Sequence, residues 1–299
     1  MRTSWTGVGT ALVTPFTANG DIDDLAYRKL ARRQVDAGIH FLVPCGTTGE
    51  APTLSSAEKR RLVEIAIEEA GTKARVLAGA GGYSTADVIK SVEAFEKIGA
   101  HGILSVTPYY NRPTQEGLFQ HYKAIAESTA LPIILYNVPG RTGCNIEPAT
   151  VLRLSGVPGI VGVKEASGNI SQMAEIIRNA PADFVVLSGD DAITLPLMVL
   201  GGRGIISVVS NEIPSEMVQM VEAAERGDFA AARAIHNRIL PLMQINFVES
   251  SPGPVKYAMS QMGLCEPNYR LPMVLPSEAS QGKINTVLKA LNMGGHEGP

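Results

Sequence analysis

The amino-acid sequence predicts a (β/α)8 barrel, the TIM-barrel fold, followed by a helical C-terminal region. Eight short apolar segments alternate with eight helical patterns, and no strand pattern follows Gly227. Continuous apolar runs are typical of parallel strands that are covered on both faces. Eight alternating units favour closure into a barrel over an open, doubly wound sheet. We therefore expect a barrel over residues 1–226 and a helical region over residues 227–299 that packs on it.

The predicted strands are short runs rich in Val, Ile and Leu. They are Gly7–Val13, Phe41–Cys45, Val76–Gly81, Gly102–Thr107, Pro132–Val138, Ile160–Lys164, Phe184–Ser188 and Gly204–Val209. Active sites of this fold lie at the C-terminal ends of the strands. The residues that end or follow each run are therefore the candidates for chemistry.

Helical patterns fill the intervals between these runs, with apolar residues three or four positions apart. Gly71 and Gly99 are suitable helix stops. The predicted helices of the barrel are Asp24–Ala37, Ser56–Ala70, Thr85–Ile98, Glu116–Ser128, Pro148–Leu154, Ile170–Asn179, Ala192–Leu200 and Pro214–Glu225. The C-terminal region adds Asp228–Val248, Pro254–Met262 and Gly282–Leu291, and we expect residues 294–299 to be frayed.

Composition excludes several classes of protein. The 299 residues are 45% hydrophobic and 18% charged, which suits a well-packed globular protein. A net charge of −3 without a basic stripe argues against nucleic acid as a partner. Residues 1–7 lack the apolar core of a signal peptide, and no apolar run approaches the ~20 residues of a membrane span. We therefore expect a cytoplasmic protein. Three widely spaced cysteines make a disulfide framework improbable.

Lys164 is the foremost candidate for a catalytic residue. It ends the segment Gly159-Ile-Val-Gly-Val-Lys164, which otherwise has the character of a strand buried on both faces. Burial disfavours the ammonium form of a lysine, and the resulting neutral amine can attack a ketone to form a Schiff base. The structural alternative is a lysine at a strand end that reaches solvent or an acidic partner.

The fifth predicted strand carries a tyrosine and leads to an arginine. Tyr136 is the fourth residue after Pro132, and Lys164 is the fourth after Ile160. If the two strand starts align, both side chains stand at the same height about 4.8 Å apart, inside the barrel mouth. A phenol there is a plausible proton carrier. Arg141 follows in a Pro/Gly-bounded loop, where it either binds a substrate carboxylate or makes a surface salt bridge.

The loop after the second strand, Cys45-Gly-Thr-Thr-Gly-Glu50, combines two glycines with two adjacent hydroxyls. Its exposed N–H groups and hydroxyls suit a carboxylate or a phosphate, although a simple glycine-containing turn is the alternative. No lysine follows the second glycine, so the loop is not a P-loop. Cys45 fits a small buried hydrophobe better than a nucleophile.

Other strand ends offer weaker signals. Ser188-Gly-Asp-Asp191 suggests a helix N-cap more than a magnesium site, and Gly189 and Ile206 are candidates for the floor of a pocket near Lys164. The paired tyrosines of Tyr109-Tyr-Asn-Arg-Pro113 are taken as packing or interface residues. The five histidines have no metal-ligand spacing, and no dinucleotide fingerprint is complete.

Taken together, these motifs resemble one family. They are Gly46-Thr-Thr-Gly-Glu50, Tyr109-Tyr-Asn-Arg-Pro113, Tyr136-Asn-Val-Pro-Gly-Arg-Thr-Gly143, Gly162-Val-Lys-Glu-Ala-Ser167 and Ser188-Gly-Asp-Asp191. In this order they are similar to those of the 4-hydroxy-tetrahydrodipicolinate (dihydrodipicolinate) synthases. That family belongs to the pyruvate-dependent class I aldolases, which include N-acetylneuraminate lyase. The resemblance runs from about Trp5 to Leu291, and Arg141 points to the synthases within this superfamily.

The resemblance implies a role for each candidate. Lys164 forms an imine with pyruvate, which becomes an enamine and attacks L-aspartate-4-semialdehyde, without a metal or other cofactor. Tyr136, Thr47 and Tyr110 form a proton relay, with Tyr110 supplied by a neighbouring subunit. Thr48 and the Ile206 backbone hold pyruvate, and Arg141 binds the carboxylate of the semialdehyde. The family is commonly a homotetramer, a dimer of dimers, and its reaction is the committed step of lysine biosynthesis through diaminopimelate.

One departure concerns regulation. Some bacterial members bind inhibitory lysine at the dimer interface through polar residues and histidines. Ser56 and Lys59 stand where those members carry histidines, and Tyr83 stands at an asparagine position. Because a lysine side chain repels a lysine ligand, we expect weak or absent feedback inhibition. Two other functions remain open, namely another pyruvate-dependent aldolase of the superfamily and a non-catalytic pyruvate-binding protein.

Overall fold

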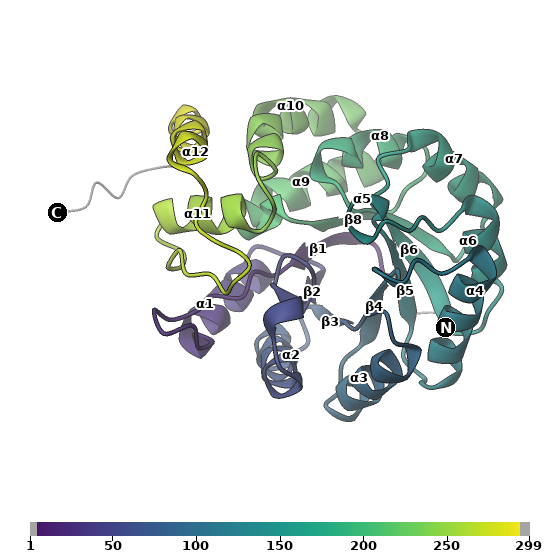
Figure 1. The fold of residues 1–299 in the computed structure, drawn as a ribbon. Coiled ribbons are helices and arrows are strands. Elements are labelled where there is room, and N and C mark those ends of the chain that lie inside the picture. Colours follow the sequence, from purple (N-terminus) through teal and green to yellow (C-terminus); the bar gives the residue numbers. More distant parts are fainter. Residues whose placement is uncertain (1–4, 294–299) are drawn as a thin grey trace.

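The computed structural model describes residues 5–293, and its centre is a closed barrel of eight parallel strands in the order β1 to β8. Figure 1 shows the strands ringed by helices. The strands are β1 Gly7–Ala11, β2 Phe41–Val43, β3 Arg75–Gly79, β4 Gly102–Val106, β5 Ile133–Asn137, β6 Ile160–Glu165, β7 Val185–Ser188 and β8 Gly204–Ser207. The predicted fold class and all eight strands are thus confirmed, although most strand ends differ from the prediction.

Helices α1 to α4 and α6 to α9 cover the outside of the barrel (Figure 1), whereas α5 lies at its C-terminal mouth. They are α1 Asp24–Asp36, α2 Ser56–Ala70, α3 Thr85–Lys97, α4 Gln115–Glu127, α5 Pro139–Thr142, α6 Pro148–Ser155, α7 Ile170–Asn179, α8 Thr194–Val199 and α9 Pro214–Glu225, with short 3-10 helices η1 Ala51–Thr53, η2 Asp191–Ile193 and η3 Val209–Asn211. The predicted helix Ala192–Leu200 is divided between η2 and α8. The sequence analysis missed α5, which follows β5 directly and carries Arg141.

The barrel closes where β1 meets β8, and glycine makes this contact possible. Gly7 pairs with Gly204, and a Cβ built on Gly204 would lie 1.9 Å from the Gly7 carbonyl oxygen. Gly204 also has a φ of +130°, which side-chain-bearing residues rarely adopt. Any larger residue at position 204 would therefore push the first and last strands apart.

The buried apolar side chains form two layers. One cluster fills the barrel lumen and includes Trp5, Phe41, Leu104 and Ile206, while a larger cluster packs the helices against the outside of the strands. Trp5 meets Phe41 edge to face, with ring centroids 5.3 Å apart. The lumen is therefore a packed core below the C-terminal mouth, not a channel.

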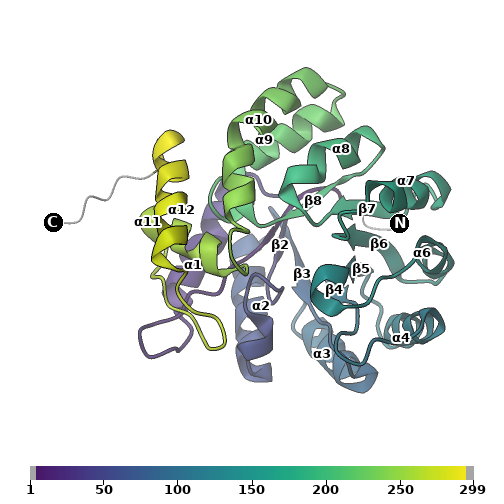
Figure 2. The same ribbon diagram turned by 45° about the horizontal axis from the view of Figure 1, so that its top comes forward.

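Three helices follow α9, namely α10 Phe229–Ile245, α11 Gly253–Gln261 and α12 Glu278–Ala290. Helix α10 packs on α9, and α12 packs on α10 and α11. Figures 1 and 2 show α11 and α12 on the side of the barrel that carries α1. The division into two domains at residue 227 stays a prediction, and residues 294–299 lie outside the described part. Within residues 5–293, no helix is long and apolar enough to cross a membrane.

The register of β5 against β6 decides how Tyr136 and Lys164 meet. Ile133 pairs with Ile160, whereas Ile134 pairs with Gly162, so β6 contains one extra residue. Beyond this irregularity Tyr136 pairs with Lys164, as the sequence analysis expected. The assumed alignment of Pro132 with Ile160 was wrong by one residue, and the irregularity in β6 compensates for it.

Candidate active site

A cavity of about 140 Å³ lies at the C-terminal mouth of the barrel. Its wall combines residues from several strand ends with two from the C-terminal region. The lining residues are Thr47, Thr48, Tyr136, Val138, Arg141, Lys164, Ala166, Gly189, Asp190, Val208, Phe247 and Ser251. Six of the eight predicted site residues are therefore brought together in one cavity.

Lys164 is 5% exposed, and its amine faces Tyr136. The Nζ atom lies 4.2 Å from the centroid of the Tyr136 ring, over its face. Among the described residues, no hydrogen bond or ion pair to Nζ accompanies this contact. The alternative of a salt-bridged Lys164 is therefore not found among residues 5–293. A buried amine without an acidic partner is suited to react as a nucleophile.

The residues that follow Tyr136 and Lys164 on their strands point outwards and hold the strand ends together. Asn137 donates from Nδ2 to the Glu165 carboxylate, at 3.2 and 3.1 Å to the two oxygens. The same carboxylate accepts the Ser167 N–H at 2.7 Å and the Gln172 side chain at 2.9 Å. Because each buried polar group has partners, this network fixes the backbone from which Lys164 and Tyr136 project.

The Gly46–Glu50 segment forms a tight turn that presents Thr47 and Thr48 to the cavity. The N–H of Gly49 donates to the Gly46 carbonyl at 3.1 Å, and the N–H of Glu50 donates to the Thr47 carbonyl at the same distance. The Thr14 hydroxyl donates to the Gly49 carbonyl at 2.7 Å. Thr48 is buried, so its hydroxyl is positioned in the wall rather than free in solvent.

Gly189 leaves the space that the Lys164 side chain occupies. A Cβ at this position would lie 3.0 Å from Lys164 Cε and 2.6 Å from Ala166 Cβ. Gly189 therefore does form part of the pocket floor beside Lys164, as the sequence analysis suggested.

The two aspartates after Gly189 accept hydrogen bonds from nearby backbone N–H groups. Asp190 caps η2 by accepting the Ala192 N–H at 2.9 Å, which confirms the predicted N-cap. Asp191 accepts the Ser207 hydroxyl at 2.6 Å and the N–H groups of Val208 and Val209 at 3.1 Å. Burial raises the pKa of Asp191 to about 6, although these three donors oppose the shift. Within residues 5–293, no cluster of His, Cys, Asp or Glu has the arrangement of a metal site.

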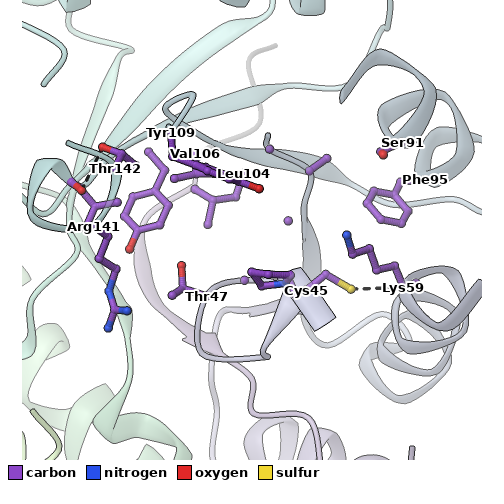
Figure 3. Close-up of a pocket in the computed structure, with 18 residues that line it drawn as sticks. Cys45, Thr47, Lys59, Ser91, Phe95, Leu104, Val106, Tyr109, Arg141 and Thr142 are labelled. Carbon is purple, nitrogen blue, oxygen red and sulfur yellow. Dashed lines mark hydrogen bonds between the residues drawn. The ribbon is translucent and has the colours of Figure 1, made fainter. Parts of the chain in front are cut away.

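Arg141 stands between the cavity at the barrel mouth and a neighbouring one of about 260 Å³. Its Nη2 donates to the carbonyl of Ser251 at 3.3 Å. Thr47, Tyr136 and Val138 also belong to both walls. Figure 3 shows the neighbouring cavity, with Arg141 and Thr47 at one end and Lys59 at the other.

Two predicted residues do not line the catalytic cavity. Tyr110 is 89% exposed, has a φ of +72° and lines neither cavity at the barrel mouth. Ile206 is fully buried in the lumen cluster, and Val208 contributes to the cavity wall instead.

Sequence reasoning missed Phe247 and Ser251, which reach the cavity from the segment between α10 and α11. No signal in the sequence marks them, because they lie between two helices and do not follow a strand. The prediction for Cys45 fits its surroundings. The residue is 4% exposed, and burial raises the pKa of its thiol to about 12, which leaves it uncharged.

A buried lysine against a tyrosine ring, in a cavity at the mouth of a TIM barrel, suits a lyase that works through a lysine amine. The model of the Dihydrodipicolinate synthetase family matches residues 4–291. The chain belongs to this family.

Named relatives are similar over nearly the whole chain. The 4-hydroxy-tetrahydrodipicolinate synthase of Koribacter versatilis is 49% identical over 94% of both chains. The dihydrodipicolinate synthase structure from Aquifex aeolicus is 40% identical, with a TM-score of 0.95 over 98% of this chain and 100% of that one. The Acinetobacter baumannii enzyme, solved in complex with pyruvate, gives a TM-score of 0.95 at 40% identity over 97% and 100%.

Proposed function

We propose that the protein condenses pyruvate with L-aspartate-4-semialdehyde and releases 4-hydroxy-tetrahydrodipicolinate. This is the committed step of lysine biosynthesis through diaminopimelate. The observation that carries the proposal is the buried Lys164 amine over the Tyr136 ring in a cavity that Thr47, Thr48 and Arg141 also line. Family membership over almost the full chain supports the same reaction.

The chemistry begins at Lys164. The amine adds to the ketone carbon of pyruvate, and loss of water gives a protonated imine. This cation is the electron sink that lets the methyl group lose a proton, so the reaction requires neither a metal nor an organic cofactor. The resulting enamine carbon attacks the aldehyde of the semialdehyde. The amino group of that substrate then attacks the imine carbon, which closes the ring and frees Lys164.

The proton transfers are assigned to Tyr136, Thr47 and Tyr110. Tyr136 lies against the reacting amine, and Thr47 shares the cavity wall with it. Tyr110 is 89% exposed and lines neither cavity of its own chain, which supports its supply by a neighbouring subunit. The assembly proposed is a homotetramer, built as a dimer of dimers and located in the cytoplasm.

Substrate binding is assigned to groups that suit carboxylates. Thr48 and the Ile206 backbone would hold pyruvate, while Gly189 leaves room beside Lys164. Arg141 stands at the rim with its guanidinium steadied by the Ser251 carbonyl, where its fork can take the carboxylate of the second substrate.

Borohydride reduction tests the covalent step. The protein is incubated with pyruvate and sodium borohydride, and peptides are analysed by mass spectrometry. We expect a stable adduct on Lys164, and no adduct in the Lys164→Ala variant. An adduct on another lysine, or none, would overturn the mechanism.

Arg141→Ala tests the choice of second substrate. Loss of the guanidinium should lower kcat/KM for the semialdehyde on the order of a hundredfold, about 3 kcal/mol for a charged hydrogen bond, while pyruvate trapping persists. Normal turnover by the variant would contradict the assignment of Arg141 to binding of the second substrate. Turnover of N-acetylmannosamine in preference to the semialdehyde would assign the protein to another aldolase of the superfamily.

A further inference from the structure

A second lysine, Lys256 on α11, is even more buried than Lys164. Its side chain is 0% exposed and pairs with Glu50, which is 1% exposed. Lys256 Nζ donates to Glu50 Oε1 at 2.7 Å and to the carbonyl of Asn268 at 2.6 Å. It also lies 4.5 Å from the ring centroid of Phe16 and 4.9 Å from that of Tyr269. The charge is thus enclosed by partners, and it lines neither of the two cavities at the barrel mouth.

Glu50 ends the turn that carries Thr47 and Thr48. Its backbone N–H donates to the Thr47 carbonyl at 3.1 Å, and its φ of +54° is unusual for a residue with a side chain. Such a conformation costs about 1 kcal/mol or more and persists only where the surroundings impose it. The side-chain contacts of Glu50 are the evident restraint.

Both oxygens of the Glu50 carboxylate are held by the C-terminal region. Oε1 accepts from Lys256, and Oε2 accepts the N–H of Arg270 at 3.3 Å. The Arg270 side chain also donates to the carbonyl of Thr53, just beyond the turn, at 3.1 Å. The Thr47–Thr48 turn is therefore held in place by residues of the C-terminal region that are more than 200 positions away in the sequence.

We propose that Lys256 and Glu50 are positioning residues, whose buried ion pair sets the Thr47–Thr48 turn for the carboxylate of pyruvate. This inference rests on the proposed function, which assigns pyruvate to that turn. The pair acts through the turn and does not touch the substrate. It makes the C-terminal helices a part of the pyruvate site, in addition to the wall residues Phe247 and Ser251.

The test is steady-state kinetics of Lys256→Met, Glu50→Gln and the double variant in the full-length protein. Each single change removes the ion pair, so the turn loses its charged restraint and keeps only the weaker contact with the Arg270 N–H. We expect KM for pyruvate to rise about tenfold or more and KM for the semialdehyde to stay within about twofold. A purely structural role would lower the amount of active enzyme, and so the apparent kcat, with both KM values unchanged.

The double variant Glu50→Gln/Lys256→Met keeps the test informative if a single variant fails to fold. Leaving one buried charge unpaired is more destabilising than removing both, so the double variant should melt closer to the wild type than Lys256→Met does. It should still show the raised KM for pyruvate. Tyr257→Phe is the matched control on α11, because it removes a 3.1 Å hydrogen bond from Asn285 and leaves Glu50 untouched.

The outcomes separate this inference from the proposed function. Failure of borohydride to trap pyruvate on wild-type Lys164 would overturn the function. Normal trapping and turnover in the wild type, together with a wild-type KM for pyruvate in the double variant, would overturn the positioning role alone. A raised KM for pyruvate in Tyr257→Phe would also do so, because the effect would then not depend on the ion pair.

Discussion

The position of the Lys164 amine depends on the absence of a side chain at residue 189. A methyl group there would approach Lys164 Cε to 3.0 Å and Ala166 Cβ to 2.6 Å. Either the lysine or the strand end must then move. The same amine also lies 4.2 Å from the centroid of the Tyr136 ring, so a shift of the lysine would disturb this contact.

Gly189→Ala is therefore expected to impair catalysis, because the Lys164 amine or the strand end must shift. A displacement of the amine by about 1 Å should lower kcat on the order of a hundredfold. Gly282→Ala is the matched control, because its Cβ would meet no atom within 4 Å on α12. The control should keep wild-type turnover. Equal activity of the two variants would contradict the role given to Gly189.

At the residue scale, the candidates for chemistry could be predicted from the sequence, but the residues that hold them in place could not. Lys164 and Tyr136 could be predicted because a charge and a phenol interrupt apolar strands. Lys256 lies in a helix, where lysine is a common residue. Nothing in the sequence therefore indicated that its side chain is completely buried. The wall residue Phe247 was equally hidden, because its place depends on how α10 and α11 pack over the mouth.

At the scale of elements, the start of α2 is tied to the C-terminal region. Ser55 and Glu58 form a capping box, and the Glu58 carboxylate also accepts from Arg270 at 2.5 and 3.1 Å. The Arg270 hydrogen bond is the main cause that lowers the pKa of Glu58 to about 2. Because the folded pKa lies below the usual value near 4.3, this contribution to stability is present above about pH 4.5 and is lost as the pH falls towards 2.

Glu58→Gln should accordingly lower the free energy of unfolding by about 1 kcal/mol at pH 7. The difference from the wild type should shrink as the pH falls from 4.5 towards 2. Denaturant melts across this range provide the measurement. Glu127→Gln, which alters an exposed helical pair with Lys123, is the control and should change stability very little. A Glu58→Gln effect that is constant with pH would be inconsistent with the ion pair.

Most elements were predictable because their start and stop signals are local. Helix α7 begins after the N-cap Asn169 and matches its predicted range fully. Strand ends were less accurate, since β2 stops at Val43 where the chain turns and Cys45 takes a φ of +58°. Helix α5 has only four residues, too few to show an apolar period.

At the scale of the whole molecule, Tyr110 is 89% exposed and lines neither cavity of its own chain at the barrel mouth. If a partner supplies it, two defective variants should complement each other. Tyr110→Phe and Lys164→Ala should each be nearly inactive alone. After joint unfolding and refolding, mixed dimers gain one intact site, so activity should recover to about a quarter of the wild type at most.

The control mixes Tyr136→Phe with Lys164→Ala. Both residues belong to one chain's cavity, so this mixture should stay inactive. Complementation by this pair, or none by the first, would show that Tyr110 does not cross between subunits.

The predicted response to lysine also concerns the molecule beyond its active-site cavity. Lys59 lines the cavity of about 260 Å³ beside the active site, and Tyr83 packs edge to face on Tyr109 at 5.4 Å. A cation at this place opposes binding of the cationic amino acid lysine. We expect millimolar L-lysine to inhibit turnover little, and Lys59→His to be more sensitive than the wild type. Half-maximal inhibition of the wild type below 1 mM would contradict this prediction.

The extra residue in β6 has a consequence for how this chain can vary. Val161 belongs to the lumen cluster and Val163 to the outer one, so the alternation of sides changes phase between them. Without that change, Lys164 would face the helices and Glu165 the lumen. Catalytic competence therefore depends on whether the number of residues in one short stretch is odd or even. Loss or gain of a single residue between Ile160 and Lys164 would exchange an amine for a carboxylate in the cavity, with almost no change in composition.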